Sequence, residues 1–356
     1  MLLINNVEPN SIEFLESEGN YKKNILFDSS NSEIPNEFVN DILKDARRAA
    51  EAHRRNRQNL QQIIKPGVSL KKIVETVEDN TRILLKGEMN DGIGFPTGIS
   101  LNECAAHFTL NPGDEDIFLT EKDVLKIDFG THSNGVIMDS AFTVAFDPTY
   151  EPLLAASKEA TRVGIKNMGV DVRVCDVGAA ISEVIYSYEV EINNQIFPIK
   201  PVENLNGHSI EKFTIHAGIS IPPVDNKDKT KVKENTFYAI ETFATTGGGY
   251  VVNGKNCSHY ILNPSRKIQV KNENVKTVYE IIKKKLTTLP FCPRYIDHLM
   301  PSQNSSLVPV KMLAMLKAID SYPPLVDIKN SFVSQFEHTI FIGEHGKEIL
   351  TIGDDY

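Results

Sequence analysis

The chain of 356 residues has no tryptophan, few cysteines and no apolar run long enough to cross a lipid bilayer. About eighteen consecutive apolar residues are the minimum that is typical of a transmembrane helix, so the sequence predicts no membrane-spanning segment. The first twenty residues also lack the basic leader and apolar core of a signal peptide. We therefore expect a cytoplasmic protein without a membrane partner.

The four cysteines lack any spacing that would indicate a shared role. Cys104, Cys175, Cys257 and Cys292 are far apart, and no C-x-x-C pair occurs. Neither a disulfide framework nor a zinc–thiolate site is indicated, and a reducing compartment fits this pattern. We interpret the cysteines as packing residues.

An excess of basic charge is also missing, since the formal net charge is −9. Sequence-independent binding of nucleic acid depends on clustered Lys and Arg, so no nucleic-acid partner is expected. One local exception is the run "RRAAEAHRRNR" at residues 47–57. Its helical spacing and its internal Glu51 favour a solvent-exposed helix face over a nucleic-acid patch.

The sequence indicates two related halves after a polar N-terminal segment. Residues 1–36 are rich in Asn, Ser and Glu and predict a partly ordered extension. Residues 37–64 are helix-forming, and "KPGVS" then ends this helix and offers Ser69 as the N-cap of the next one. The segment "GVDVRV" at 169–174 echoes "GVSLKK" at 67–72, again between two helical stretches. This echo permits a duplicated helix–helix–strand plan.

The second half ends differently from the first. Residues 264–320 predict helices, with Val275, Val278, Ile282 and Leu286 at helical spacing. This block separates the apolar strand "TFYAIETFA" from the last predicted strands, "SQFEHTIFI" and "KEILTIG". It is therefore interpreted as an insertion. The glycines of "TTGGGY" at 245–250 have no lysine–serine or lysine–threonine pair after them, so they indicate a tight turn rather than a phosphate-binding loop.

Two aspartates interrupt apolar strands in "LKIDFGTHSNGVIMDSA", at residues 128 and 139. If Ser133 and Asn134 form the hairpin turn, Asp128 and Asp139 lie directly opposite each other with Cβ atoms ~5 Å apart. Two carboxylates at that distance repel by roughly 3 kcal/mol at an effective dielectric constant near 20. Either a shared proton or a divalent cation between them can offset this cost.

Three further residues in apolar strands can complete a metal site: His208, Glu241 and Glu337. Taken singly, each is more readily a solvent-facing or structural residue. Five such residues in order, each within an apolar strand, are not easily explained in that way. An oxygen-rich set with one imidazole suits a pair of Mn, Fe, Co or Zn ions and is poor for a lone structural zinc.

These motifs, taken together, resemble those of a known family. The segments concerned are "FPTGISLNECAAHF", "KIDFGTHSNGVIMDSAFTVAF", "NGHSIEKFTIHAG", "AIETFATTGGG" and "SQFEHTIFI". They are similar to methionine aminopeptidase of type 2, within the pita-bread metallopeptidases, and the match runs from about residue 37 to the final "GDDY". The resemblance implies an α+β fold in which a pseudo-twofold antiparallel sheet is covered by helices. It also implies one catalytic domain, 37–356, that contains the helical type 2 insertion at about 260–322.

The same resemblance implies the site residues and their roles. Two divalent ions per subunit would be held by five ligands, of which Asp139 and Glu337 bridge both ions. The ligands are Asp128, Asp139, His208, Glu241 and Glu337. His107 and His216 match the histidines that contact the substrate, and Glu241 is the expected general base. The methionine pocket would be lined by Phe95, Gly98, Ile215, His259 and Tyr322.

The implied reaction is removal of the N-terminal methionine from nascent polypeptides when the second residue is small. A hydroxide between the ions would attack the amide carbon, and His216 would stabilise the oxyanion. The free α-amine would bind near His107, which excludes internal peptide bonds. The physiological metal is left open, because the same ligands accept several ions.

Two rival functions remain open from the sequence. Another pita-bread peptidase, such as a proline-directed aminopeptidase or a prolidase, would use the same ligands and differ only in its pocket and in lacking the insertion. A non-catalytic binding homologue of the same fold would have lost ligands, and all five are present here. We expect a monomer. Transient association with ribosomes stays open, because residues 1–36 have no lysine-rich or acidic block of the kind that many eukaryotic members carry.

Overall fold

The computed structural model describes residues 37–86, 90–300, 305–344 and 346–356. The predicted extension, residues 1–36, lies outside this part of the chain. Across the described segments, every helix is too short or too polar to cross a membrane.

The first half begins with two helices that cover one three-stranded sheet. Ser69 caps the second helix by accepting a hydrogen bond from the amide of Lys72, as the sequence predicts. Its predicted apolar face, which includes Ile73 and Val77, is buried. The elements are α1 (Glu37–Gln61), α2 (Leu70–Leu84), β1 (Asp91–Leu101), β2 (Cys104–Ala106), β3 (Val124–Ser133) and β4 (Val136–Ala145). The sheet order is β1-β3-β4, with antiparallel pairs.

The second half repeats the pattern around a larger sheet with the order β16-β15-β10-β8-β9. After a short 3-10 turn, η1 (Pro148–Tyr150), its helices are α3 (Glu151–Asn167) and α4 (Val174–Tyr186). Its strands are β5 (Glu189–Ile192), β6 (Gln195–Pro198), β7 (Lys200–Pro201), β8 (Gly207–Ile210), β9 (Ser220–Ile221), β10 (Thr236–Thr245), β15 (Val333–Gly343) and β16 (Gly346–Ile349). Strands β5 and β6 form a separate hairpin.

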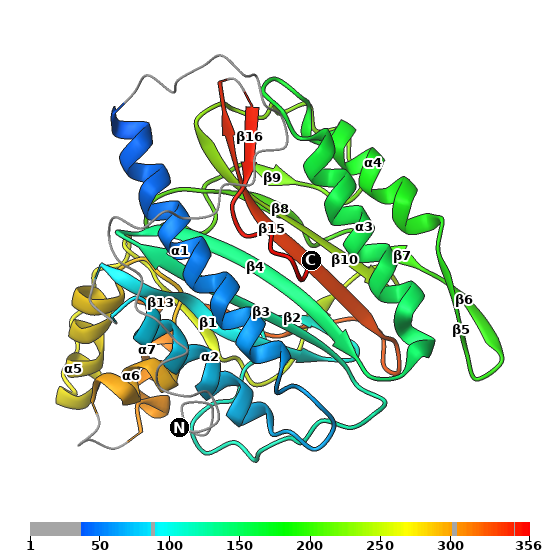
Figure 1. Cartoon of the computed structure of the whole chain (residues 1–356). Helices are drawn as coiled ribbons and strands as arrows, with labels where there is room; N and C mark the ends of the chain where they lie inside the picture. Colours follow the sequence, from blue (N-terminus) through cyan, green and yellow to red (C-terminus); the bar gives the residue numbers. More distant parts are fainter. Residues whose placement is uncertain (1–36, 87–89, 301–304, 345) are drawn as a thin grey trace.

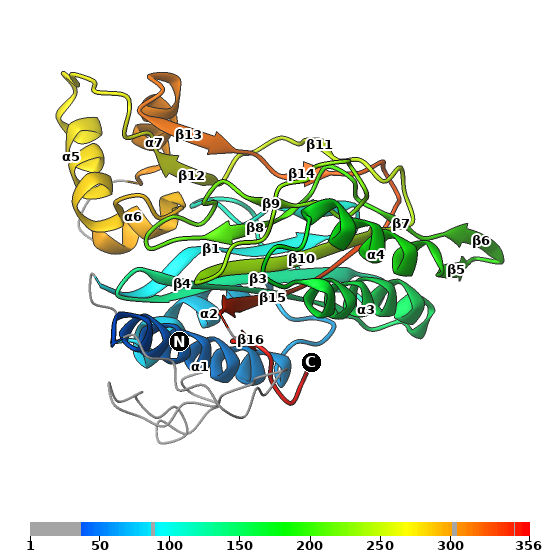
Figure 2. The same ribbon diagram turned by 90° about the horizontal axis from the view of Figure 1, so that it is seen from above.

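The two halves are related as the repeated sequence segment suggests, but their equivalent residues are offset by two positions from those that the echo pairs. Ser69 and Arg173 each precede the second helix of a half, and each forms an isolated antiparallel bridge. The turn before each of them contains a residue with positive φ, Gly67 at 88° and Asp171 at 64°. Gly67 therefore corresponds to Asp171, two residues later than the echo "GVDVRV" implies. Helices α1 and α3 cover the same side of the strands (Figures 1 and 2).

Two threonines join the halves where β4 and β15 run side by side. The Thr143 hydroxyl donates to the carbonyl of Gln335 and accepts from its amide, both at 2.7 Å. The Thr339 hydroxyl does the same with Asp139, at 2.7 and 2.8 Å. These hydroxyl bonds take the place of backbone-to-backbone hydrogen bonds between β4 and β15. They fix the position of Asp139 relative to β15.

The predicted insertion packs around a core of its own. Strands β12 (His259–Leu262) and β13 (Ile319–Tyr322) pair, and the helices lie between them in sequence. These are α5 (Glu273–Ile281), the π-helix η2 (Ile282–Leu286), α6 (Pro293–Leu299) and α7 (Leu307–Met315). Val275, Val278 and Ile282 are buried there, and Leu286 packs against them. The boundary of a subdomain at about 260–322 stays a prediction.

Two contacts anchor the insertion to the first half. Arg294 binds the carboxylate of Glu78 at 2.6 Å and donates to the carbonyl of Leu110. The Tyr295 hydroxyl donates to the carbonyl of Phe95 at 3.0 Å. The insertion therefore lies against the segments that follow and precede β2.

The glycine-rich segment after β10 holds a buried carboxylate rather than making only a turn. Asp327 accepts hydrogen bonds from the amide of Gly248 and the hydroxyl of Thr245, at 2.9 and 2.7 Å. A Cβ at Gly247 would lie 2.5 Å from the Asp327 carboxylate. Asp327 follows β14 (Leu325–Val326), which pairs with β2 and with β11 (Val252–Asn253).

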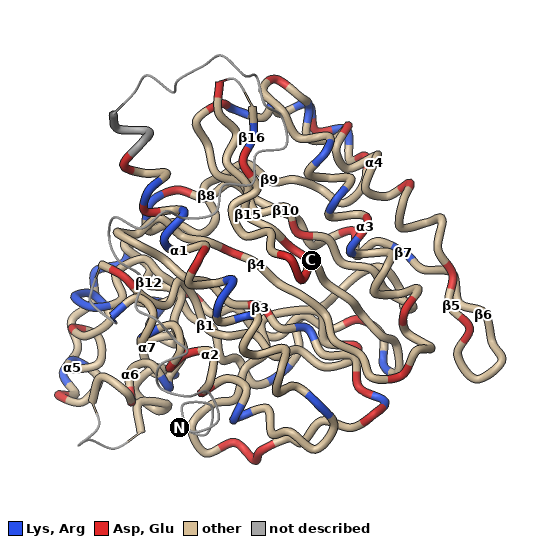
Figure 3. Tube along the Cα trace, in the orientation of Figure 1, with Lys and Arg blue, Asp and Glu red and all other residues tan. Residues whose placement is uncertain are grey.

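The basic run at residues 47–57 is not a solvated face, and that prediction is wrong. Arg48, Arg54 and Arg57 are buried. Blue and red segments alternate along α1 (Figure 3). Arg47, Arg54 and Arg57 reach partners near the far end of the sequence. Arg57 binds the Asp355 carboxylate at 2.5 and 2.7 Å. Helical periodicity could not distinguish a solvent-facing arginine from one with a partner almost three hundred residues away.

Candidate metal centre and substrate pocket

The hairpin that carries the two aspartates turns one residue later than predicted. Asn134 and Gly135 are its central residues, with φ of 48° and 81°. This is the Asn-Gly combination that two-residue hairpins favour, because both positions need positive φ. Asp128 therefore pairs with Ala141 and Asp139 with Gly130, so the predicted direct pairing of the aspartates is wrong. Moving the turn by one residue changes each cross-strand partner by two residues. Both carboxylates therefore stay on the same face of the sheet, as diagonal neighbours.

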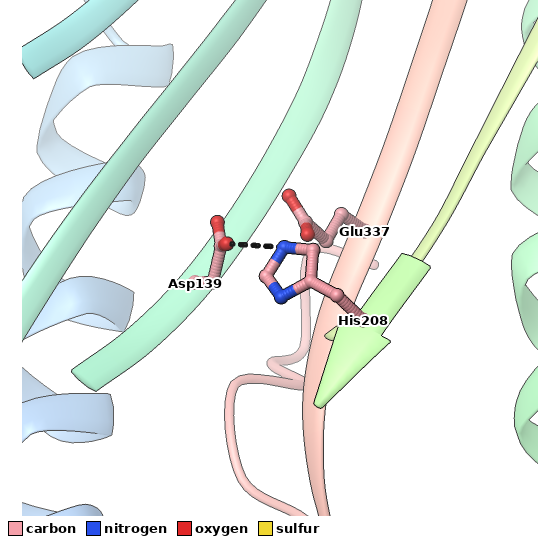
Figure 4. Close-up of side chains that lie close together, drawn as sticks. All are labelled: Asp139, His208 and Glu337. Atoms are coloured by element: carbon pink, nitrogen blue, oxygen red, sulfur yellow. Dashed lines mark ion pairs between the residues drawn. The ribbon is translucent and has the colours of Figure 1, made fainter. Parts of the chain in front are cut away.

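Five strands, β3, β4, β8, β10 and β15, bring the predicted ligands together. Glu241 on β10 pairs directly with Glu337 on β15, and His208 on β8 pairs with Ala239 on β10. Ligand atoms of Asp139, His208 and Glu337 lie within 4.8 Å of one another. Figure 4 shows these three side chains converging from β4, β8 and β15. Asp128, Glu241 and Glu337 form a second group by the same measure. The two groups share Glu337.

Burial makes the ionised forms of these carboxyls costly. Loss of solvation raises the pKa of Asp139 to about 7. Burial, followed by the repulsion from Asp139, Glu241 and Asp128, raises the pKa of Glu337 well above its usual range. The pKa values of Asp128 and Glu241 are raised in the same direction, first by burial and then by neighbouring carboxylates. Burial lowers the pKa of His208 to about 4, which keeps the imidazole neutral and able to act as a ligand.

The buried oxygens of this cluster are short of partners. Among the described residues, Asp128 Oδ1, Asp139 Oδ1 and both carboxylate oxygens of Glu337 are buried without a hydrogen-bond donor. An unpartnered buried carboxylate requires a proton or a cation. The residues therefore fit divalent metal, and the donor set of four carboxylates and one imidazole suits Mn, Fe, Co or Zn.

Gln335 belongs to the cluster although sequence analysis did not single it out. Its amide nitrogen donates to Asp128 Oδ2 at 3.0 Å and to Glu241 Oε1 at 2.8 Å. It therefore joins two of the carboxylates that repel each other. The available signal was the strand period of two, because Gln335 precedes Glu337 by two residues and shares its face.

A pocket opens over this cluster, and every predicted substrate-contacting residue lines it. The lining includes Phe95, Gly98, His107, Ile215, His216, His259 and Tyr322, together with Asp128, Asp139, His208 and Glu241. Pro96, Ile261 and Pro290 also line it and were not predicted. Their apolar side chains carry no chemistry that a sequence pattern would single out.

Ring contacts order the pocket walls. The ring of His107 lies 5.6 Å from that of His259 and meets Tyr322 edge-on at 6.0 Å. The ring of His216 lies 4.2 Å from that of His208, and both line the pocket. Loss of solvation and the neighbouring His208 lower the pKa of His216. Phe95 packs over Gly130 so closely that a Cβ there would lie 2.4 Å from its ring.

The fold and the site define a class of protein. Two related antiparallel halves, with carboxylates and histidines converging under one pocket, form the arrangement of the pita-bread metallopeptidases.

Comparisons with known proteins agree with this class. The model of metallopeptidase family M24 matches residues 44–288, more than half of the chain. Methionine aminopeptidase 2 of Encephalitozoon hellem is 54% identical over 355 residues, which are 100% of this chain and 99% of the relative. The chain therefore belongs to metallopeptidase family M24 and, within it, to the methionine aminopeptidases of type 2.

Solved structures of lower identity show the same fold. A thermophilic Arx1 matches with a TM-score of 0.72 at 16% identity, over 89% of this chain and 92% of that one. Methionine aminopeptidase from Thermotoga maritima matches with a TM-score of 0.59 at 19% identity, over 90% of this chain and 99% of that one. The fold class predicted from the sequence is thus confirmed.

Proposed function

We propose that this chain removes the N-terminal methionine from polypeptides at a centre of two divalent ions. The observation that carries the proposal is the pair of ligand groups that share Glu337 beneath one pocket. Asp139 and His208 would hold one ion, and Asp128 and Glu241 the other. A bridging role of Asp139 beside that of Glu337 remains part of the proposal. Bound divalent ions supply a hydroxide nucleophile near neutral pH and stabilise developing negative charge.

Three side chains would handle the protons and the charge of the substrate. Glu241 lines the pocket and would accept the proton of the attacking water and pass it toward the leaving amine. His216 would donate a hydrogen bond to the oxygen of the scissile carbonyl as negative charge develops there. His107 lies in the pocket wall beside His259 and Tyr322, where it would orient the substrate's terminal amine.

The pocket accounts for selection of an N-terminal methionine. Phe95, Ile215 and Tyr322 provide apolar surface for an unbranched, polarisable thioether. These residues would enclose the first side chain and exclude a preceding residue, so that only a chain terminus would reach the metal ligands. A proline-directed peptidase would need its selectivity at the second residue instead.

A peptide assay tests the proposal. Release of methionine from Met-Ala-Ser should require Mn, Co, Fe or Zn, stop with chelator and return when metal is restored. Ala-Pro-Ser, the substrate class of the proline-directed rival, should not be cleaved. Metal-independent release, or preference for Ala-Pro-Ser, would refute the proposal. The proposed monomer and its transient association with ribosomes are tested separately, by light scattering and by co-sedimentation with translating ribosomes.

A further inference from the structure

His216 lies just after a tight turn of the chain. Glu211 and Thr214 exchange two backbone hydrogen bonds of 2.9 Å, which close the turn and leave Phe213 at its second central position. Two residues beyond Thr214, His216 lines the pocket. The shape of the turn therefore sets where the chain places this histidine.

Phe213 has a backbone conformation that bulky residues rarely adopt. Its φ is 58°, in the left-handed region. Glycine or asparagine is usual at the second central position of a turn when φ is positive there. A bulky residue keeps this conformation only where the surrounding structure fixes it. Contacts from outside the turn must therefore hold Phe213 in place.

Two distant segments of the chain contact Phe213. Its amide donates to the carbonyl of Gly135 at 2.8 Å, and its ring covers that glycine so closely that a Cβ there would lie 2.3 Å from a ring atom. Its carbonyl accepts a hydrogen bond from the Thr288 hydroxyl at 2.6 Å. Gly135 belongs to the β3–β4 hairpin, whereas Thr288 lies in the predicted insertion, between η2 and α6. The turn is thus bonded both to the first half and to the insertion.

The neighbouring candidate ligand is held in another way. His208 lies in β8, which pairs with β10 and with β9. His216 lies outside the named strands. On one side of it, the amide of Ala217 donates to the carbonyl of Ser209 at 2.8 Å. On the other side, the support comes from the turn, so a change at Thr288 should affect His216 more than His208.

We propose that Thr288 is a positioning residue for the reaction, because its hydroxyl holds the carbonyl of Phe213 and so orients His216 in the pocket. Pro290, two residues after Thr288, lines the pocket itself. One segment of the insertion therefore supplies part of the pocket wall and also supports a side chain that acts on the substrate. The inference deepens the proposed function and rests on it for the role of His216.

Loss of the Thr288 hydroxyl should lower the rate of the reaction more than the binding of substrate. Thr288→Val keeps the size of the side chain and removes the donor. A hydrogen bond from His216 to developing charge is strongest in the transition state, so its misplacement affects kcat before KM. We expect kcat for Met-Ala-Ser to fall about fivefold, the equivalent of one net hydrogen bond, and KM to change less than about twofold. Metal affinity should equal that of wild type, because the strand pairs of β8 hold His208.

Three further variants show whether the hydroxyl acts through His216. Thr288→Ser keeps the hydroxyl and should restore kcat. Thr277→Val is the matched control, because the Thr277 hydroxyl also donates to a backbone carbonyl of the insertion, that of Glu273 at 2.9 Å, but within α5. It should leave kcat unchanged. In His216→Ala, which lacks the imidazole, Thr288→Val should cause no further loss of kcat.

Hydrogen exchange measures the support of the turn directly and needs no substrate. In metal-free Thr288→Val, the amides of Phe213 and Thr214 should exchange about fivefold faster than in wild type. The amides of β8 should keep their wild-type rates.

Three results would overturn the inference: an unchanged kcat in Thr288→Val, a loss of the same size in the His216→Ala background, or unchanged exchange of the two turn amides. If wild type releases no methionine but the exchange depends on Thr288 as expected, the proposed function fails and the support of the turn by the insertion stands.

Discussion

The same strands present two different environments on their two faces. On the site face, Asp128, Asp139 and Glu337 leave buried oxygens without donors. On the rear face, which α1 and the last residues of the chain cover, the buried charges are paired: Arg57 with Asp355, and Arg47 with Glu348 at 2.7 Å. Tyr356 lies there against His338, with ring centroids 4.7 Å apart, and its hydroxyl donates to the carbonyl of Ala141 at 2.9 Å.

Buried charged residues therefore have a different role on each face of the strands. Neighbouring residues of one strand alternate between them: Glu337 faces the site, while Phe336 and His338 contact Tyr356 on the rear. Rear charges meet their partners within the chain and hold strands in place. Within the part of the chain that the structure describes, Gln335 supplies donors to only two of the site oxygens, so the unpartnered ones require protons or a ligand.

The largest effect should come from removing the residue that both ligand groups share. Glu337→Gln keeps the size of the side chain but removes its charge, and the acidic cluster then repels less. We expect activity to fall by more than the ~10–100-fold that is typical of losing an outer-shell partner. Metal content should drop below that of wild type, while the metal-free protein becomes no less stable. Titration calorimetry and thermal unfolding measure these quantities. Wild-type metal content in this variant would contradict the shared role.

Removing a charge on the rear face should instead lower the stability of the protein and leave metal binding intact. Arg57→Met leaves the half-buried Asp355 carboxylate with only the Gln61 amide as a side-chain donor, so the cost should lie below the about 3–5 kcal/mol typical of breaking a fully buried pair. Denaturant unfolding should show this loss, while the protein that remains folded still binds metal. Adding Asp355→Leu should recover much of the stability. Arg173→Met is the control, because its pair with Asp176 is half exposed and exposed pairs contribute little to stability. A loss of metal binding without a loss of stability in Arg57→Met would remove the distinction between the faces.

Dependence on pH should also separate the two faces. The folded-state pKa of Asp139, about 7, lies above the usual carboxyl value, so its neutral form stabilises the metal-free fold. That contribution is complete below about pH 4 and disappears as the pH rises through about 7, at roughly 1.4 kcal/mol per pH unit. Unfolding of metal-free wild type and of Asp139→Asn across this range gives the difference. An identical pH dependence in the two proteins would count against the buried acid, and added metal should reverse the trend in wild type.

The smallest effect should follow from the loss of one rear hydroxyl. Tyr356→Phe keeps the ring between His338 and Arg57 but removes the bonds to Ala141 and Ser140. We expect a loss of about 1 kcal/mol in denaturant unfolding and little change in metal affinity. A tenfold weaker metal affinity would instead show that the rear face sets the geometry of the ligands.

Sequence analysis predicted local features well where one pattern decides them. The cap at Ser69 and the apolar face of α2 follow from short-range periodicity, and both are found. The five proposed ligands came from carboxylates and a histidine in apolar strands, and these side chains do converge. The resemblance to a family supplied the roles that geometry alone does not assign.

The misses share a physical cause, because each depended on a distant partner or on the competition between turns. Asn134 and Gly135 compete with Ser133 for the turn, and their positive φ decides the register. Arg57 is buried because Asp355 returns to it. Gln335 matters only because two carboxylates from other strands reach its amide. Asp355 is distant in sequence from Arg57, and Asp128 and Glu241 are distant from Gln335.

Glu337 joins the candidate site only when β15 pairs with β10 and packs against β4, which are far from it in the sequence. The β3–β4 hairpin, with its two aspartates, can form from local contacts soon after synthesis, whereas pairing of β15 with β10 and β4 joins segments far apart and is slow. Neither ligand group is complete without β15. A molecule whose β15 has not docked would therefore carry Asp128 and Asp139 without the carboxylate that the two proposed ligand groups share.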